Sequence, residues 1–551
     1  MGSNCRSRSG AFQSYRFTIK SMQSMYRIYL SVLIFLSLTL SLFAQQQPDT
    51  SIDVQHYLFK IDVNDSNNII QGKATITVKF LQNVQQLKLD LAQKNATGKG
   101  MVVTEVSSGN QSVTFTQDSQ HVIINSAVQT GQISTFVIKY NGVPADGLII
   151  STNRYKHRTF FGDNWPNRAH NWLPCKDHLS DKASVEFVVT APDHYQVIGN
   201  GVQVEETNLP YSRKLTHWVS DAELPTKVMV IGIADFAVNY IGNVNNIPVY
   251  SWVYPEDRDS GFTTYAIAKN VLPFYISHVG PYAYKKLANV QSKTIFGGME
   301  NASAIFYYEK SVSAPDAEAL IAHEIAHQWF GDNATEKNWQ HIWLSEGFAT
   351  YMTHLYHEEK YGIDSFNKRM KVDRRAIIGF SKKRNTPVVD TSYSNNITQL
   401  LNDNSYQKGG WVLHMLRRKI GDTAFWQSVR AYYAQYAGKN ANTEDLQKVF
   451  EEVSHQNLSA FFKQWLYTPG QPKLSVEWVY NNAKKTVTVT VEQQQNTLFE
   501  FPLEVAVSGS DAHKTVEIKD KITSFDIAVS SKPTSLVVDQ NVNLLFEEVK
   551  K

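Results

Sequence analysis

The segment LIAHEIAHQWFGDN, residues 320 to 333, places three polar side chains in the middle of an otherwise apolar helical pattern. On such a helix His323 and His327 project from the same face, one turn apart. Two imidazoles at this spacing can bind one tetrahedral metal ion, and Glu324 lies beside them. Because unpaired polar groups are costly to bury, the fold has to bring partners or a further ligand to this helix.

The residues around this segment predict where its helix begins and ends. Ser313 and Asp316 are spaced as a capping box around Pro315, so we expect the helix to begin there. Gly331 is expected to end it. The H-E-x-x-H pattern is typical of zinc sites, but a pattern of five residues is only suggestive by itself. A third ligand is therefore needed.

Glu346, in WLSEGFATYM, is a candidate third ligand. It follows His327 after 18 intervening residues and lies on the next predicted helix. Two histidines and one carboxylate leave one zinc position open for water, as in catalytic rather than structural zinc sites. We interpret His323, His327 and Glu346 as ligands of one Zn²⁺ ion per chain. The alternative makes the histidines core residues and Glu346 a solvated residue, which leaves charged groups without a role in an aromatic region.

The length and charge of the chain limit the classes of protein that fit. With 551 residues, 42% of them hydrophobic and 12% aromatic, the chain has apolar material for about three domains of ordinary size. The 54 Lys and Arg residues against 51 Asp and Glu leave a net charge of +3. Because no overall positive field favours nucleic acid, we expect no nucleic-acid partner.

The first 44 residues have the pattern of an export signal. Basic residues precede an apolar run from Ile28 to Ala44, and the first acidic residue is Asp49. This pattern predicts a secretory signal peptide over residues 1–44 and a secreted or periplasmic protein. The alternative is an uncleaved membrane anchor, because the run approaches the length of a short spanning helix. Cleavage would leave Cys175 as the single thiol, so stability has to come from packing.

The hydrophobic pattern divides the rest of the chain into three regions. From 50 to 250, segments such as GKATITVKF and STFVIKYNG alternate apolar and polar residues, which predicts strands. Helical periodicity dominates 251–470, and the strand pattern returns over 471–551, as in KTVTVTVEQ. We expect a multidomain α+β protein with an N-terminal β domain, a mixed α/β catalytic domain and a small C-terminal β domain.

Five motifs follow one another along the chain: WLPC at 172–175, GGMEN at 297–301, HEIAHQWFG at 323–331, WLSEGFATY at 343–351 and YQKGG at 406–410. In order and spacing they resemble the zinc aminopeptidases that include aminopeptidase N and leukotriene A hydrolase, which are gluzincin metallopeptidases. The resemblance runs from about residue 50 to the end. It implies a thermolysin-like catalytic domain, a C-terminal β sandwich, and removal of the N-terminal residue from peptides with a free N-terminal amine.

The resemblance also implies a role for individual residues. His323, His327 and Glu346 bind zinc, and Glu324 is the general base. Tyr406 stabilises the tetrahedral intermediate. The chemistry of these side chains agrees, because a carboxylate beside a zinc site can transfer a proton and a phenol can donate to a developing oxyanion.

The GGMEN motif carries the substrate contacts that the resemblance implies. Its substrate-binding residues are Gly297, Gly298, Met299 and Glu300, and Glu300 binds the free α-amino group. One position departs from the family. A Glu or Gln that helps to hold the amine falls twelve residues before the Asp that follows WLPC, and this position is Trp165 here. Asp163 and Asn164, its neighbours, are the candidates to replace it.

A second departure concerns the end of the chain. Larger members carry a long helical domain after the small β module, whereas this sequence stops at Lys551 and resembles a short member. Two other functions therefore stay open: a zinc endopeptidase with an open cleft, and a non-catalytic peptide-binding protein that retains the fold. His354 and His357 have helical spacing too, but the charges around them predict a solvated face, and we assign them no role.

Overall fold

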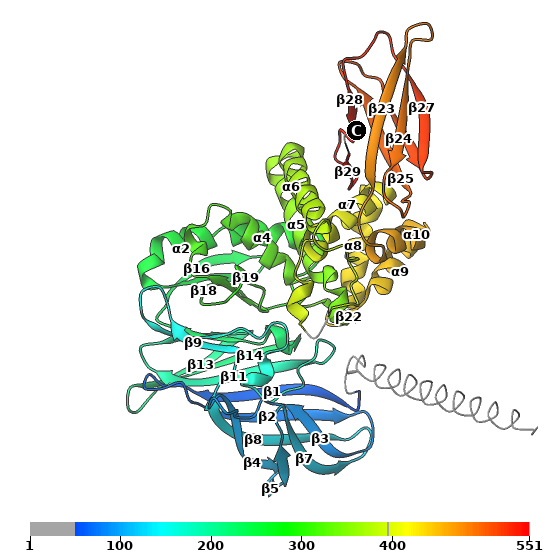
Figure 1. Cartoon of the computed structure of the whole chain (residues 1–551). Coiled ribbons are helices and arrows are strands. Elements are labelled where there is room, and N and C mark those ends of the chain that lie inside the picture. Colours follow the sequence, from blue (N-terminus) through cyan, green and yellow to red (C-terminus); the bar gives the residue numbers. More distant parts are fainter. Residues whose placement is uncertain (1–49, 394–395, 550–551) are drawn as a thin grey trace, which may run out of the picture. The chain divides into compact units, whose positions relative to one another are not determined.

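The computed structural model describes residues 50–393 and 396–549 (Figure 1). The predicted signal peptide, residues 1–44, lies outside this part of the chain. Contacts join the described chain from Ser51 onwards into one unit. Within the described ranges, the structure contains no helix that combines the length and the hydropathy needed to cross a membrane.

Strands make up most of residues 52–253, as the alternating pattern predicts. An eight-stranded sheet has the order β13-β14-β11-β1-β2-β8-β4-β5. Its long strand β1 (Ile52–Asp62) pairs antiparallel with β2 (Ile70–Phe80) and parallel with β11 (Lys182–Pro192). In β2 the apolar residues on one face are fully buried, because residues alternate between the two faces of a strand. The other strands are β4 (Gly100–Ser108), β5 (Gln111–Ser112), β8 (Ile133–Val143), β13 (Val202–Leu209) and β14 (Arg213–Pro225).

Two smaller sheets complete this β-rich region. One has the order β12-β15-β10-β9 and the other β3-β7-β6. The β-rich character predicted for this part of the chain is confirmed, whereas its boundary at residue 250 stays a prediction. The strands are β3 (Val84–Asp90), β6 (Phe115–Gln117), β7 (His121–Val128), β9 (Leu148–Thr152), β10 (Arg158–Gly162), β12 (Gln196–Gly199) and β15 (Ile231–Ala234).

A mixed five-stranded sheet introduces the helical region. Its order is β16-β17-β18-β20-β19, in which the three central strands are parallel and the two edge strands antiparallel. The parallel core is almost fully buried, as expected for strands that are covered on both faces. Its strands are β16 (Ala237–Val244), β17 (Ile247–Val253), β18 (Leu287–Ser292), β19 (Gly298–Met299) and β20 (Ala304–Tyr308).

Helices α4 and α5 pack against each other, and α4 also contacts the edge strand β19 (Figure 1). The helical character predicted for this region is confirmed, although the sheet interrupts it. The helices are α2 (Arg258–Tyr265), α3 (Ala268–His278), α4 (Ala317–His327), α5 (Trp343–Tyr361), α6 (Ile363–Ser381), α7 (Gly409–Ile420), α8 (Asp422–Tyr436), α9 (Thr443–Ser454) and α10 (Ser459–Phe462). Two π-helical turns are η7 (Asn404–Lys408) and η8 (Lys463–Tyr467), and strands β21 (Thr335–Glu336) and β22 (Asn440–Ala441) form a short parallel pair.

The boundaries of α4 differ from the prediction. The helix begins after Asp316, whose side chain makes no capping hydrogen bond, and residues 311–313 form a separate 3₁₀ turn. Ala314 has an extended backbone because it precedes Pro315, so Ser313 cannot cap the same helix. The predicted capping box is therefore wrong. The helix also ends at His327, before Gly331, which has a φ of +118° in the turn that follows.

The last part of the described chain forms two antiparallel-rich sheets. One has the order β27-β24-β23-β29 and the other β26-β25-β28. Their strands are β23 (Lys473–Asn481), β24 (Thr486–Gln493), β25 (Phe501–Val507), β26 (His513–Ile518), β27 (Ile522–Ala528), β28 (Leu536–Val538) and β29 (Glu547–Glu548). His414 of α7 is buried and bonds the carbonyl of Val542, which ties this β region to the helices.

Two buried lysines connect the N-terminal β region to the segment that follows α4. Lys227 Nζ lies 2.7 Å from Glu336 Oε1 of β21, and both side chains are almost completely buried. Lys182 Nζ donates to the carbonyls of Asn333 and Lys439. A buried charge without its partner is strongly destabilising, so these contacts fix how the β region meets the segment after α4.

The Lys227–Glu336 ion pair leads to a stability prediction. Lys227→Met should lower the free energy of unfolding by about 3–5 kcal/mol, because it leaves the carboxylate of Glu336 buried and unpaired. The double variant Lys227→Met/Glu336→Leu should recover most of this loss. Urea denaturation measures both. As a control, Lys285→Ala removes a solvent-exposed pair with Asp221 and should cost less than about 1 kcal/mol. Equal losses in the single and double variants would contradict this account.

Candidate active site

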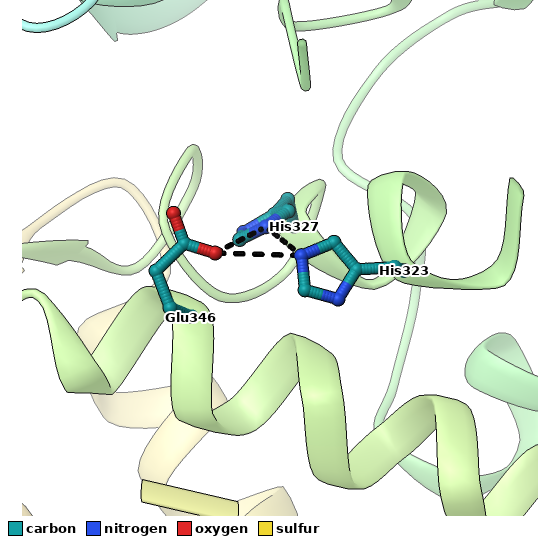
Figure 2. A group of neighbouring side chains, drawn as sticks. All are labelled: His323, His327 and Glu346. Atoms are coloured by element: carbon teal, nitrogen blue, oxygen red, sulfur yellow. Dashed lines mark hydrogen bonds and ion pairs between the residues drawn. The ribbon is translucent and has the colours of Figure 1, made fainter. Parts of the chain in front are cut away.

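The three predicted metal ligands come together between α4 and α5. The Nε2 atoms of His323 and His327 are 3.0 Å apart, and Glu346 Oε2 lies 3.4 Å from the first and 3.2 Å from the second (Figure 2). Ligand atoms that each lie about 2.0–2.1 Å from a tetrahedral zinc ion are about 3.3 Å from one another. The separations observed in this cluster are therefore close to those that a zinc site requires.

The charges in this cluster also fit a divalent cation. Glu346 Oε2 is buried and accepts no hydrogen bond from any residue that the structure describes, although it faces both imidazoles. Glu300 and Glu324 lie close by, with carboxylate oxygens within 4.8 Å of His327 and of each other. Because buried carboxylates need compensating charge, a cation bound by His323, His327 and Glu346 would satisfy this group.

Ser345 and the carbonyl of Phe330 orient the imidazole of His327. His327 Nδ1 lies 3.1 Å from Phe330 O and 3.0 Å from Ser345 Oγ. A proton on Nδ1, donated to the carbonyl, leaves the Nε2 lone pair free to face a metal. Ser345 directly precedes Glu346 in WLSEGFATY, and no spacing in the sequence predicted its contact with His327.

The electrostatic environment differs for the two histidines. Burial lowers the pKa of His323, and Glu346 opposes this only in part. For His327, burial also disfavours the charged form, but the carboxylates of Glu346 and Glu300 outweigh it and raise its pKa to about 10. His327 therefore faces more negative charge than His323 does. A cation would be bound on the side of the cluster where these carboxylates lie.

Glu324, on the same helix, has a buried carboxyl group. Burial raises its pKa well above the ordinary value; His327 opposes this, and the carboxylate of Glu300 adds to it. Gly298 makes room for this group, because a Cβ atom at that position would lie 2.2 Å from Glu324 Oε1. A carboxylate with a raised pKa accepts a proton more readily, which suits a general base.

The GGMEN motif forms the free edge of the five-stranded sheet. Gly298 and Met299 are strand β19, which pairs on one side with Phe306 and Tyr307 of β20. Gly297 is exposed, and the side chain of Met299 is part of the hydrophobic core. The substrate contacts expected of these three residues would therefore come from their backbone, because an edge strand can pair with an extended peptide.

Glu300 is buried at the end of β19, 6% exposed, and turns toward the metal cluster. Its carboxylate, that of Glu324 and an imidazole nitrogen of His327 lie within 4.8 Å of one another. A positively charged group bound at Glu300 would therefore be only a few ångströms from the proposed metal position.

Tyr406 belongs to the π-helical turn η7, which contacts α5. Its ring is nearly parallel to that of His323, with 6.0 Å between the centroids. The close approach of α5 to the chain at the end of η7 depends on two glycines, because a Cβ on Gly347 would lie 2.9 Å from the Cα of Gly409. Burial, and then Glu346, raise the pKa of Tyr406 well above its ordinary value, so the phenol keeps its proton.

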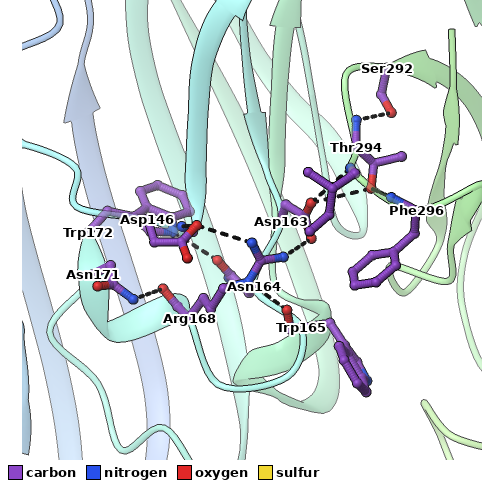
Figure 3. A network of polar contacts seen from close by, with 12 residues as sticks. Asp146, Asp163, Asn164, Trp165, Arg168, Asn171, Trp172, Ser292, Thr294 and Phe296 are labelled. Carbon is purple, nitrogen blue, oxygen red and sulfur yellow. Dashed lines mark hydrogen bonds and ion pairs between the residues drawn. The ribbon is translucent and has the colours of Figure 1, made fainter. Parts of the chain in front are cut away.

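Trp165, at the position of the family's second amine partner, packs in an aromatic cluster. Its ring meets Phe296 edge-on at 5.6 Å and Trp339 at 5.5 Å, centroid to centroid. Neither neighbour is free to replace the missing group. Asp163 pairs with Arg168, and the amide of Asn164 donates to Met229 O and accepts from the indole of Trp172 (Figure 3).

The charge pattern predicted that His354 and His357 lie on a solvated helix face, and this prediction is wrong. Both are buried, and His354 Nε2 lies 2.7 Å from Asp373 Oδ2 of α6. The charged residues near them in sequence face other directions around α5, so the local composition was misleading. Neither histidine belongs to the metal cluster.

Two comparisons of sequence support the resemblance. A model described as the peptidase family M1 domain matches residues 264–465, and one described as the peptidase M1 N-terminal domain matches residues 53–228. Together they match more than half of the chain, and they describe adjoining domains of one metallopeptidase family. The chain belongs to the M1 peptidase family.

The individual relatives have low sequence identity to this chain. The chain is 26% identical to probable aminopeptidase 2 of Sulfurisphaera tokodaii, over 89% of this chain and 63% of the relative. It is 25% identical to leucyl aminopeptidase of Saccharolobus solfataricus, over 74% of this chain and 54% of the relative. The chain therefore spans less than two thirds of the length of these curated relatives.

A solved structure has a similar fold. The crystal structure of Legionella pneumophila aminopeptidase A in complex with aspartic acid matches with a TM-score of 0.78 and 16% identity. The match covers 92% of this chain and 60% of the other. At this identity the likeness shows the fold.

The geometry of the cluster predicts one metal ion per chain. His323→Ala, His327→Ala and Glu346→Ala should each reduce the zinc content from about one per chain to a small fraction, because each removes one of three protein ligands. Elemental analysis of purified protein measures it. His354→Ala is the matched control, since it removes a buried histidine of α5 outside the cluster, and it should retain zinc. Full zinc in all three ligand variants would exclude this site.

Proposed function

We propose that the protein is a zinc-dependent aminopeptidase, which hydrolyses the N-terminal residue from peptides with a free N-terminal amine. The observation that carries this proposal is the position of Glu300, whose carboxylate lies within 4.8 Å of Glu324 and His327. A carboxylate that binds the α-ammonium at this place leaves room for about one residue between the amine and the metal.

In this proposal His323, His327 and Glu346 hold the zinc ion. When bound, zinc would supply a Lewis acid that polarises the scissile carbonyl and makes a coordinated water more acidic. Ser345 and Phe330 O orient His327 toward the ion. Membership of a metallopeptidase family and the donor set support zinc as the metal.

Glu324 would transfer the protons during hydrolysis of the peptide bond. Its buried carboxylate accepts a proton from the attacking water and delivers it to the leaving amine. Burial supports this role, since it raises the pKa of the carboxyl group toward the range in which a base both takes and returns a proton. Gly298 leaves room for this carboxylate, because a Cβ atom at that position would clash with it.

Tyr406 would donate to the oxygen that becomes negative as the carbonyl is attacked. Its raised pKa keeps the hydroxyl protonated at neutral pH, and its ring lies beside His323. The contact between Gly347 and Gly409 holds the turn that carries Tyr406 against the helix that carries Glu346.

The substrate backbone would pair with β19, which is an edge strand with one side unpaired in its sheet. This pairing aligns an extended peptide, and Glu300 at the end of the strand binds its α-ammonium. Strand pairing together with Glu300 favours an exopeptidase over an endopeptidase. A peptide that continued past the position of the α-ammonium would place an uncharged amide there and leave the buried carboxylate of Glu300 unpaired.

Three further proposals follow from the sequence and the family. The catalytic region is thermolysin-like, which the mixed sheet with α4 and α5 supports. The two C-terminal sheets form a β sandwich, which their antiparallel pairing and buried apolar faces support. The protein is exported to the periplasm or secreted, which the basic residues and apolar run before residue 45 support.

The role of Glu324 is separable from metal binding. Glu324→Gln should retain about one zinc per chain but lower kcat by at least about 10²- to 10⁴-fold, because an amide cannot accept the proton. Initial rates on an aminoacyl amide and zinc analysis measure the two effects. Glu318→Gln changes another glutamate of α4, which pairs with Lys360, and should leave turnover close to that of the unmodified protein. Substantial activity in Glu324→Gln would remove this residue from the mechanism.

The aminopeptidase proposal is tested with a pair of substrates. Leucinamide carries a free amine, whereas N-acetyl-leucinamide does not, and only the first should be hydrolysed well. Glu300→Ala should lower kcat/KM for leucinamide by about 10- to 100-fold, as expected for loss of a charge-assisted bond of about 1.5–3 kcal/mol. If blocked peptides are cut internally at comparable rates, the endopeptidase alternative replaces the proposal. If nothing is hydrolysed by zinc-loaded protein, the protein is a binding protein.

A further inference from the structure

We propose that Gln328 and Asp163 are positioning residues, which hold the segment 294–303 so that Glu300 stands at a fixed distance from the metal ligands. This inference rests on the proposed function, because it assigns to these two residues the selectivity for a free N-terminal amine. Neither residue is one of the three metal ligands. Gln328 bonds the turn that follows β19, and Asp163 bonds the residues that precede it.

Gln328 holds the turn that follows β19. Its side chain is fully buried, and its Nε2 donates to the carbonyl of Glu300 at 2.6 Å. Its Oε1 accepts from the backbone N–H of Ser303 at 2.8 Å. One amide therefore bonds both ends of the turn 300–303. Because Gln328 directly follows His327, this turn is bound to the same stretch of chain that carries a metal ligand.

The amide of Gln328 is itself fixed on the opposite side. Nε2 also donates to Asp332 Oδ2 at 2.9 Å, and Oε1 accepts from the hydroxyl of Tyr282 at 3.3 Å. Asp332 N–H in turn donates to the carbonyl of His327. Rotation of the amide would break several buried hydrogen bonds at once, so the side chain has one orientation.

Asp163 holds the other side of the strand, from the N-terminal β region. Its Oδ2 accepts from the backbone N–H of Ile295 at 3.3 Å and from Thr294 Oγ1 at 3.4 Å (Figure 3). Its Oδ1 pairs with Arg168, which also reaches Asp146. Figure 3 shows Arg168 between the two carboxylates. The side chain of Asp163 is fully buried, so its charge is satisfied only by these contacts.

These contacts matter because β19 is too short to position Glu300 by itself. The strand has two residues, and among the strands that the structure describes it pairs with one neighbour, β20. A shift of about 1 Å in a group that positions substrate can lower a rate by about 100-fold. Bonds at 294–295 and at 300–303 therefore help to determine where Glu300 stands relative to the metal ligands on α4 and α5.

The test compares variants that loosen this segment with variants that make the same change elsewhere. Gln328→Met keeps the volume and removes all four hydrogen bonds, and Asp163→Ala removes the acceptor of Ile295. Gln493→Met is the control for the first, because Gln493 is fully buried and bonds both the N–H and the carbonyl of Phe499. Asp539→Ala is the control for the second, because Asp539 pairs with Arg374 and accepts from two backbone N–H groups.

Two quantities are measured on zinc-loaded protein. The first is kcat/KM for leucinamide. The second is the dissociation constant of N-acetyl-leucine hydroxamate divided by that of leucine hydroxamate, which is large when the free amine is preferred. The second needs no turnover, because both probes bind the metal and differ only in the amine. We expect Gln328→Met and Asp163→Ala each to lower this ratio about 10-fold or more, while zinc content stays near one per chain. The affinity for the acetylated probe should change little.

Three outcomes would overturn the inference: an unchanged ratio in both variants at full zinc, loss of zinc in both variants, or an equal fall of the ratio in Gln493→Met and Asp539→Ala. The last would mean that general destabilisation explains the effect. The proposed function fails separately, if the unmodified protein itself shows no preference for the free amine. If Gln328→Met does not fold, Asp163→Ala and its control decide the matter.

Discussion

The burial of acidic groups between α4 and α5 is the constraint on which the rest of the structure depends. Glu300, Glu324 and Glu346 are buried and converge on His323 and His327, and several carboxylates are costly to bury together. Such a group is stable only with a compensating cation and with neighbours that fix every polar atom. This requirement explains why polar side chains around the site are buried and hydrogen-bonded: Ser345 to the imidazole of His327, Gln328 to the carbonyl of Glu300, and Lys227 to the carboxylate of Glu336.

A second consequence is that the site depends on segments that are far apart in the sequence. α4 and α5 supply the metal cluster, the edge strand β19 supplies Glu300, and the π-helical turn η7 supplies Tyr406. These elements approach closely at Gly298, which lies against the side chain of Glu324, and at the backbone contact of Gly347 with Gly409. The N-terminal β region takes part through Asp163 and Lys227. Its contribution to the proposed active site is therefore geometric, through the positions of the segments that carry the candidate catalytic residues.

Much of this arrangement could be predicted from the sequence, because the informative spacings are local. His323 and His327 are one helical turn apart, so helix geometry places them on one face. The need for a third ligand and the resemblance to the zinc aminopeptidases indicated Glu346 on the next helix. The parts that could not be predicted depend on contacts across long stretches of chain. Asp163 meets Ile295 at a separation of 132 residues, and nothing near either residue indicates it. The solvated face expected for His354 and His357 was wrong for the same reason: both are buried, and His354 contacts Asp373 of α6, which local charge does not show.

The replacement of the family's second amine partner by Trp165 is consistent with a single carboxylate at the amine position. Asp163 and Asn164 are committed to structural bonds, so Glu300 would have to bind the α-ammonium without them. Glu300 is 6% exposed, and a charge pair that is shielded from water is screened less than one at the surface. One buried carboxylate can therefore discriminate a charged amine from a blocked one, provided that its position is fixed, because the strength of the pair depends on distance. Two independent amine ligands would together define the position of the α-ammonium. With Glu300 alone, that position depends on the bonds from Gln328 and Asp163 that hold the segment around Glu300 in place.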